Sequence, residues 1–259
     1  MDAYDFTLNP YAGCSFGCSY CYAAFFSNGA DKTKSWGAWV DVKENAVQRL
    51  KRRAAGLDGK LIYMSSVTDA YQPIERRLRI TRSLLEVMAN GHKPKLVVQT
   101  RSPDVVRDCD LFRKIIDHGG RVRVNFTVTT DDEELRRTFE PHCPSNRVRL
   151  RAAREMCESG VDTCITMTPL LRVKNVDAFA HTLLDTGVKN YIVQPFHFRR
   201  GKFIAGTRDK AQSLMADKLG TDLAHFRSRY LDHYRYVREV LKDRLPNLEE
   251  GKEGFRPPF

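Results

Sequence analysis

Three cysteines near the start of the chain have the residue type and spacing for metal chemistry. Cys14, Cys18 and Cys21 form a Cys-x3-Cys-x2-Cys pattern. Gly13 and Gly17 favour an irregular loop over a helix or strand in this segment. A loop can fold three thiolates around one inorganic centre, which a regular element could not do. Thiolates are soft ligands that select zinc, copper(I) or iron–sulfur clusters.

The number of ligands separates these possibilities. A structural zinc site takes four ligands, but the first histidine in the chain is His92 and the next cysteine is Cys109. Zinc would therefore need a distant fourth ligand. A four-iron cluster with three cysteine ligands leaves one iron open, and that iron can hold a small molecule. The pattern favours a cluster, with a zinc site or unligated thiols as the alternatives.

Composition sets bounds on location and partners. The chain has 259 residues and a formal net charge of +11, which suggests nucleic acid or an anionic redox protein as a partner. A solvated basic surface is the alternative. The seven cysteines are an odd number, and residues 1–5 lack the basic and apolar character of a signal peptide. No apolar run approaches the ~20 residues of a membrane helix. We expect a cytoplasmic protein without disulfides or membrane contact.

Alternating apolar and helical segments must position the cysteines. Short apolar runs predict six strands, and the segments between them carry helix start and stop signals. This alternation predicts an α/β fold with a parallel sheet, either open or closed into a barrel. The expected strands are residues 4–8, 61–64, 96–98, 122–128, 164–167 and 191–193. The expected helices are residues 43–55, 75–89, 103–118, 144–158 and 175–187, with a capping box at Thr130–Glu133 that opens a further helical turn.

Two segments lie outside this alternation. Residues 23–41 are predicted to be a long irregular loop, anchored by Trp36 and Trp39. From Arg208 the chain is predicted to be helical, and residues 254–259 to be extended. We therefore expect a unit over residues 1–200 and a helical extension over 201–259. In the last helix an amphipathic stripe is expected to pack on the first unit, formed by Leu223, Phe226, Tyr230, Tyr234, Val237 and Leu241.

The residues around the cysteines carry a family resemblance. Asn9-Pro10-Tyr11 precedes them and Tyr20 stands directly before Cys21. Together with the cysteine spacing, this segment resembles the signature of radical SAM enzymes. The resemblance implies that Cys14, Cys18 and Cys21 ligate a [4Fe-4S] cluster whose fourth iron binds S-adenosylmethionine. It implies reductive cleavage of that molecule to a 5′-deoxyadenosyl radical, with flavodoxin or ferredoxin as the electron donor. The implied fold is a partial (β/α)6 TIM-type barrel, with the site at the C-terminal ends of the strands.

Further motifs resemble the branch that includes spore photoproduct lyase, over roughly residues 9–195. They are Thr-Asp-x-Tyr-Gln-Pro-x-Glu at 68–75, Thr-Arg-Ser at 100–102, Phe-Glu-Pro at 139–141 and Arg-Leu at 149–150. The resemblance implies that Tyr20 packs near the adenine. The other implied contacts to S-adenosylmethionine are Ser65, Ser66, Thr68, Asp69, Arg101 and Thr127.

One position departs from that branch. The lyase has a hydrogen-donating cysteine where this chain has Ser66, and a serine O–H bond is too strong to be a comparable donor. Tyr22 still matches the tyrosine that partners the cysteine, and Cys143 is a candidate substitute donor. We therefore expect Tyr22 and Cys143 as catalytic residues and argue against repair of thymine lesions. Cys109, Cys157 and Cys164 are expected to be small buried apolar residues.

Three functions follow from these observations. The first is a radical SAM enzyme that abstracts hydrogen from an unassigned substrate. The second is a nucleic-acid repair or modification enzyme of the spore photoproduct lyase type, favoured by the positive charge. The third is a nucleic-acid-binding protein with a structural metal site.

Overall fold

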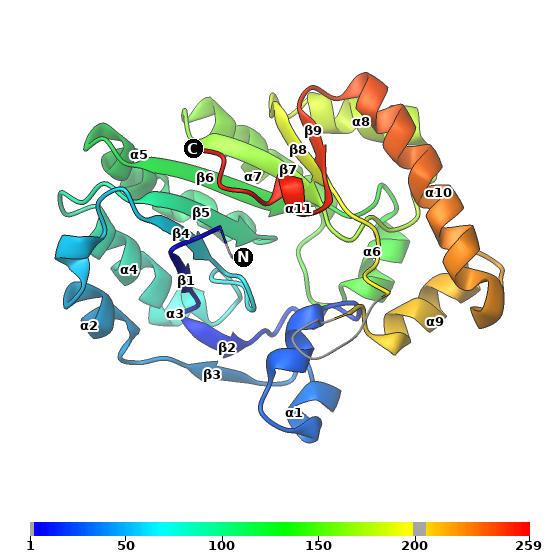
Figure 1. Ribbon diagram of the computed structural model, residues 1–259, viewed down its shortest axis with the longest axis horizontal. Helices are drawn as coiled ribbons and strands as arrows, with labels where there is room; N and C mark the ends of the chain where they lie inside the picture. Colours follow the sequence, from blue (N-terminus) through cyan, green and yellow to red (C-terminus); the bar gives the residue numbers. More distant parts are fainter. Residues whose placement is uncertain (1–2, 199–205) are drawn as a thin grey trace.

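The main feature of the fold is one parallel sheet that does not close. The computed structural model describes residues 3–198 and 206–259. Seven strands pair in parallel, with β1 and β9 at the two edges (Figure 1). The expected partial barrel is thus confirmed as an open sheet. In sheet order the strands are β1 (Phe6–Leu8), β4 (Leu61–Met64), β5 (Lys95–Thr100), β6 (Arg121–Thr127), β7 (Asp162–Met167), β8 (Asn190–Val193) and β9 (Leu248–Glu250).

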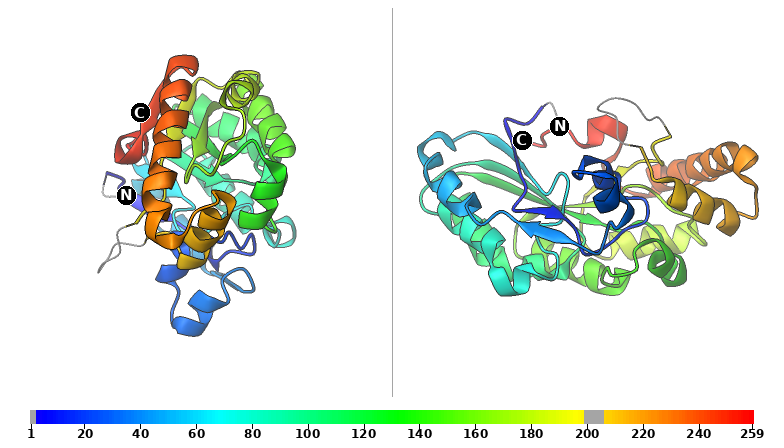
Figure 2. Two further views of the ribbon diagram at one scale, coloured as in Figure 1. Left: turned by 90° about the vertical axis from the view of Figure 1, so that its right-hand side faces the viewer. Right: turned by 90° about the horizontal axis from the view of Figure 1, so that it is seen from below.

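Helices connect successive strands and cover one face of the sheet. Figure 2 shows the helices coloured cyan to green on this face, while the two ends of the chain lie on the other. Such crossovers are the expected way to connect parallel strands. The connecting helices are α2 (Ala46–Lys51), α3 (Glu75–Leu78), α4 (Ile80–Met88), α5 (Cys109–Asp117), α6 (Glu133–Phe139), α7 (Asn146–Glu158) and α8 (Val176–Leu184), with 3-10 turns at Ala54–Gly56 and Pro103–Asp108.

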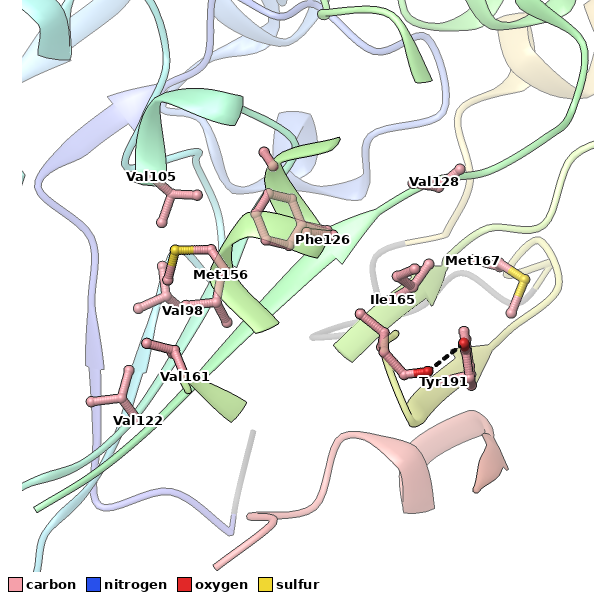
Figure 3. Close-up of a cluster of buried hydrophobic side chains, with 14 of the residues drawn as sticks. Val98, Val105, Val122, Phe126, Val128, Met156, Val161, Ile165, Met167 and Tyr191 are labelled. Atoms are coloured by element: carbon pink, nitrogen blue, oxygen red, sulfur yellow. Dashed lines mark hydrogen bonds between the residues drawn. The ribbon is translucent and has the colours of Figure 1, made fainter. Parts of the chain in front are cut away.

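The core lies between the sheet and these helices (Figure 3). Val98, Phe126 and Ile165 have no exposed area, and burial of each such side chain contributes on the order of 2 kcal/mol. Neighbouring residues in a strand point to opposite faces. In β6, therefore, Val124 and Phe126 pack on the helices while Asn125 and Thr127 face the inside of the curved sheet. The strands thus present polar side chains to the interior.

The segment after the cysteines was predicted incorrectly as irregular. Residues 23–41 contain most of a 3-10 turn (Tyr22–Phe26), helix α1 (Ala30–Lys34) and part of strand β3 (Val40–Val42). Strand β3 pairs antiparallel with β2 (Tyr11–Gly13), directly before Cys14. Both strands have only three residues, and their pairing is non-local, so no local pattern revealed them.

The C-terminal segment contributes a strand that the sequence did not suggest. Helices α9 (Asp209–Lys218) and α10 (Leu223–Arg244) precede β9 and the short helix α11 (Gly251–Gly254). The apolar stripe of α10 is buried as expected, except for Leu223, which is 62% exposed. Strand β9 has the sequence Leu-Glu-Glu, which lacks an apolar run. The predicted boundary at residues 200 and 201 lies outside the described residues. Within the described ranges, no helix is both long and apolar enough to cross a bilayer.

The predicted capping box at the start of α6 is also corrected. Asp132, not Thr130, is the N-cap residue, and its carboxylate accepts hydrogen bonds from the backbone N–H groups of Glu134 (2.9 Å) and Leu135 (3.2 Å). Ser102 and Asn175 cap their elements as expected. The helix expected over 43–55 is shorter, and Arg79, in the left-handed conformation, separates α3 from α4.

We expect Asp132→Ala to lower the free energy of unfolding by about 1 kcal/mol, because two backbone donors lose their acceptor. Urea unfolding followed by circular dichroism measures this change. Asp132→Asn is the control, since it keeps the acceptor and loses only the charge that faces Lys174 and Arg172. An equal loss in both variants would show that the ion pair, not the cap, stabilises the start of α6.

Candidate active site

A cavity of about 560 Å³ opens at the C-terminal ends of the central strands. The loop that carries the cysteines forms one wall, the ends of β4, β5 and β6 form the floor, and the C-terminal segment forms the outer side. The cavity brings together nine of the predicted site residues, which are Cys14, Tyr20, Cys21, Tyr22, Ser65, Ser66, Thr68, Arg101 and Thr127. Cys18, Asp69 and Cys143 are not among the lining residues.

Residues 14–21, which we call the cysteine loop, are tied to the fold on both sides. The Ser15 N–H donates to Gln72 Oε1 (2.9 Å), and the Ser19 N–H donates to the Phe139 carbonyl (2.8 Å). Gly17 has a φ of +61° and packs against Gly37, where a Cβ on Gly37 would lie 2.8 Å from the Gly17 Cα. The path of the loop is therefore set by contacts with the strand-end loops and by two facing glycines.

The three thiols can supply soft ligands to one metal centre. All three are free, Cys14 and Cys18 are buried, and Cys21 is half-buried. In the part of the chain that the structure describes, no three His, Cys, Asp or Glu side chains converge to hold one metal ion. A zinc ion would draw its thiolates to about 2.3 Å from a single centre. A four-iron cluster would take one thiolate at each of three corners.

The loop after β4 supplies hydroxyl groups to the cavity. Thr68 Oγ1 donates to the Gly13 carbonyl (2.6 Å), and Ser66 Oγ accepts from Asn9 Nδ2 (3.0 Å). Tyr22 lies beside this loop and donates its hydroxyl hydrogen to the Ser66 carbonyl. Three segments distant in sequence thus meet at one side of the cavity.

Asp69 is hydrogen-bonded by protein donors and is not among the residues that line the cavity. Its carboxylate accepts hydrogen bonds from Thr100 Oγ1 (2.7 Å), the Arg101 N–H (2.9 Å) and the Tyr71 N–H (2.9 Å). Burial raises the pKa of Asp69 above its usual value, although these hydrogen bonds oppose the shift. Asp69 ties the loop after β4 to the end of β5 and so places Arg101.

A buried ion pair lies behind the cysteine loop. Glu140 and Arg149 are both fully buried, and Arg149 Nη2 donates to Glu140 Oε2. Glu140 Oε1 accepts from the hydroxyls of Tyr20 (2.6 Å) and Thr129 (2.8 Å). Burial alone raises the pKa of Glu140, but the positive charges of Arg149 and Arg101 outweigh it and lower the pKa to about 2. Sequence analysis noted both residues only as motif positions.

Cys143 is buried beside Cys18, with 3.5 Å between the two sulfurs. It contacts the back of the cysteine loop and does not reach the cavity.

Sequence analysis missed a polar network on the cavity floor. Gln99 Oε1 accepts from the Tyr63 hydroxyl (2.9 Å) and from Asn125 Nδ2 (3.3 Å), and its Nε2 donates to Thr127 (2.8 Å) and Thr166 (3.0 Å). The alternation of apolar and polar residues at the end of β5 could have revealed Gln99. The network leaves the hydroxyl of Thr127 with a fixed set of partners at the cavity surface.

The C-terminal segment also lines the cavity, which no sequence signal indicated. Lys252, Glu253, Phe255 and Arg256 face it, beside Ala3 and Tyr4 from the start of the described chain. Gly254 packs directly on β8, since a Cβ there would lie 2.7 Å from Ile192 Cγ2.

We expect Glu140→Gln to lower the free energy of unfolding at pH 7 by about 3 kcal/mol, because Arg149 would keep a buried charge without a counter-ion. The folded pKa of Glu140, about 2, lies below the unfolded value of ~4.3. The stabilisation by Glu140 is therefore present above about pH 4.3 and is lost as the pH falls toward 2. Urea unfolding at pH 7 and at pH 3 measures both effects.

Glu155→Gln, on the exposed face of α7, is the matched control and should change neither value. A loss for Glu140→Gln that persists unchanged at pH 3 would contradict the assignment of a buried carboxylate.

Solved structures with similar folds include several of spore photoproduct lyase. A mutant of that enzyme aligns with a TM-score of 0.63 and 15% identity, over 95% of this chain and 76% of its own. The lyase complexed with dinucleoside spore photoproduct aligns with a TM-score of 0.61 and 14% identity, over 94% and 75%. At this identity the likeness shows the fold.

Sequence comparisons give the family. Uncharacterized protein MJ0683 of Methanocaldococcus jannaschii is 36% identical over 166 residues, which are 64% of this chain and 60% of that protein. The match thus spans less than two thirds of that relative. Uncharacterized protein Mb2609c of Mycobacterium bovis is 26% identical over 94% of this chain and 73% of its own length. Residues 8–185 match the radical SAM superfamily. The chain therefore belongs to the radical SAM superfamily and is an enzyme of that class.

Proposed function

We propose that this enzyme cleaves S-adenosylmethionine reductively at a [4Fe-4S] cluster held by Cys14, Cys18 and Cys21, and that it abstracts hydrogen from a substrate in the cavity. One observation carries the proposal. The cysteine loop and the hydroxyl-rich strand ends, far apart in the sequence, line a single cavity. When bound, the cluster supplies the electron that releases the 5′-deoxyadenosyl radical from S-adenosylmethionine.

The chain's own residues would bind and orient that molecule. The hydroxyls of Ser65, Ser66 and Thr68 offer acceptors for its ammonium group at the wall next to Cys14. Arg101 and Thr127 would provide donors, and Tyr20, a cavity residue of the cysteine loop, accepts a hydrogen bond from Arg101. The C-terminal segment limits access of water from outside. Such positioning groups act mainly by holding the reacting atoms close together.

Of the two predicted catalytic residues, Tyr22 has the better position. Tyr22 lines the cavity, whereas Cys143 lies behind Cys18. We propose that Tyr22 contacts the substrate. We also propose flavodoxin or ferredoxin as the electron donor. For the location of the enzyme we propose the cytoplasm, which is a reducing compartment.

We expect anaerobic reconstitution to load about four irons per chain, and dithionite plus S-adenosylmethionine to yield 5′-deoxyadenosine. Alanine at Cys14, Cys18 or Cys21 should abolish both iron loading and product. Cys109→Ala is the control and should keep both, since Cys109 lies at the start of α5, away from the cavity. Wild-type protein that loads iron but forms no 5′-deoxyadenosine would refute the proposal.

Nucleic acid is the second candidate substrate, favoured by the net charge of +11 and by Lys252 and Arg256 at the cavity. We expect oligonucleotide binding that weakens steeply with salt, since each phosphate contact releases a counter-ion. Lys252→Gln and Arg256→Gln should each reduce the salt slope by about 1. Arg151→Gln, exposed on α7, is the control. Absent or salt-independent binding would exclude this substrate class.

A further inference from the structure

The sulfur of Cys18 has two neighbours that can donate hydrogen bonds. Arg101 Nη1 lies 3.2 Å from the sulfur, and the sulfur of Cys143 lies 3.5 Å from it. Cys14 and Cys21 line the cavity, whereas Cys18 is turned toward these two residues. The three cysteines of the loop are therefore not equivalent.

The direction of both hydrogen bonds follows from the chemistry of a ligating cysteine. A cysteine that binds a metal is a thiolate and has no hydrogen to donate. The guanidinium of Arg101 has only donors, so Arg101 must donate to Cys18. Cys143 must also donate, because the thiolate can only accept. The other acceptor near Cys143, the Phe16 carbonyl, is farther away at 3.9 Å.

The guanidinium of Arg101 is held in this position from two sides. Its Nη2 donates to the Tyr20 hydroxyl (3.4 Å), and that hydroxyl donates in turn to Glu140. Its backbone N–H is fixed by Asp69. The Nε of Arg101 is buried and has no partner among the described residues. Two of the three guanidinium nitrogens of Arg101 thus hydrogen-bond the cysteine loop.

We propose that Arg101 and Cys143 are positioning residues that hydrogen-bond the Cys18 ligand and raise the reduction potential of the cluster. This inference rests on the proposed function. Hydrogen bonds to the sulfurs of a cluster are among the factors that set its potential, because they stabilise the reduced state, which carries more negative charge. The sequence resemblance implied another role for Arg101, as a contact for S-adenosylmethionine.

A potentiometric titration of the reconstituted cluster without S-adenosylmethionine, followed by electron paramagnetic resonance, tests this role. For Arg101→Gln we expect the ratio of reduced to oxidised cluster at a fixed potential to fall roughly tenfold, which is about 59 mV. Cys143→Ala should lower the potential in the same direction. Cys143→Ser keeps a donor and should stay near the wild type. Arg256→Gln removes a charge at the same cavity without a bond to sulfur, and should leave the potential unchanged.

Each outcome decides the matter. Unchanged potentials in fully loaded Arg101→Gln and Cys143→Ala proteins would overturn the inference. An unchanged potential with weaker binding of S-adenosylmethionine in Arg101→Gln would assign Arg101 to that ligand instead. If Arg101→Gln fails to load iron, the comparison of alanine with serine at Cys143 gives the result. A wild-type protein that loads no cluster would refute the proposed function itself.

Discussion

The fully buried ion pair of Glu140 and Arg149 is the interaction on which the site depends. A charge can stay buried only where it is paired and its remaining hydrogen-bonding groups are satisfied. Here the Glu140 carboxylate also accepts hydrogen bonds from the hydroxyls of Tyr20 and Thr129. It therefore joins Tyr20 of the cysteine loop to the end of β6 and to α7, which carries Arg149. The loop is irregular, and its own backbone hydrogen bonds among the described residues are two turn contacts, from Gly17 to Cys14 (3.3 Å) and from Cys21 to Cys18 (3.1 Å). Its geometry is therefore set jointly by this ion pair, through Tyr20, and by the hydrogen bonds and facing glycines that tie the loop to its neighbours.

The curved sheet carries the site residues that face the cysteine loop across the cavity. Its strands are apolar toward the helices and carry polar side chains toward the interior near their C-terminal ends, so the packing residues and the site residues lie on opposite faces of the sheet. Gln99 illustrates this separation, because its amide joins β4, β6 and β7 through side-chain hydrogen bonds while Val98 beside it packs in the core. Parallel strands end at a common edge, and the cavity forms there.

Sequence analysis recovered the parts of this structure that have local signals. Six of the seven strands of the sheet, the caps at Ser102 and Asn175 and the cysteine spacing all depend on residues close in the chain. The pairing of β2 with β3, the addition of β9 and the contact of Cys143 with Cys18 depend on segments far apart, and no composition or periodicity encodes them. Asp69 shows a further limit of sequence-based prediction. A motif identifies a residue but does not show which groups its side chain contacts.

The position of the C-terminal segment affects how the lining of the cavity can vary. Residues 252–256 help form the outer wall of the cavity, yet they follow the edge strand β9 and carry none of the central sheet. Substitutions in this segment would change the shape of the cavity, while the cysteine loop and the ion pair of Glu140 and Arg149 stay intact. The shape and charge of the cavity can therefore change through this segment while the sheet stays the same.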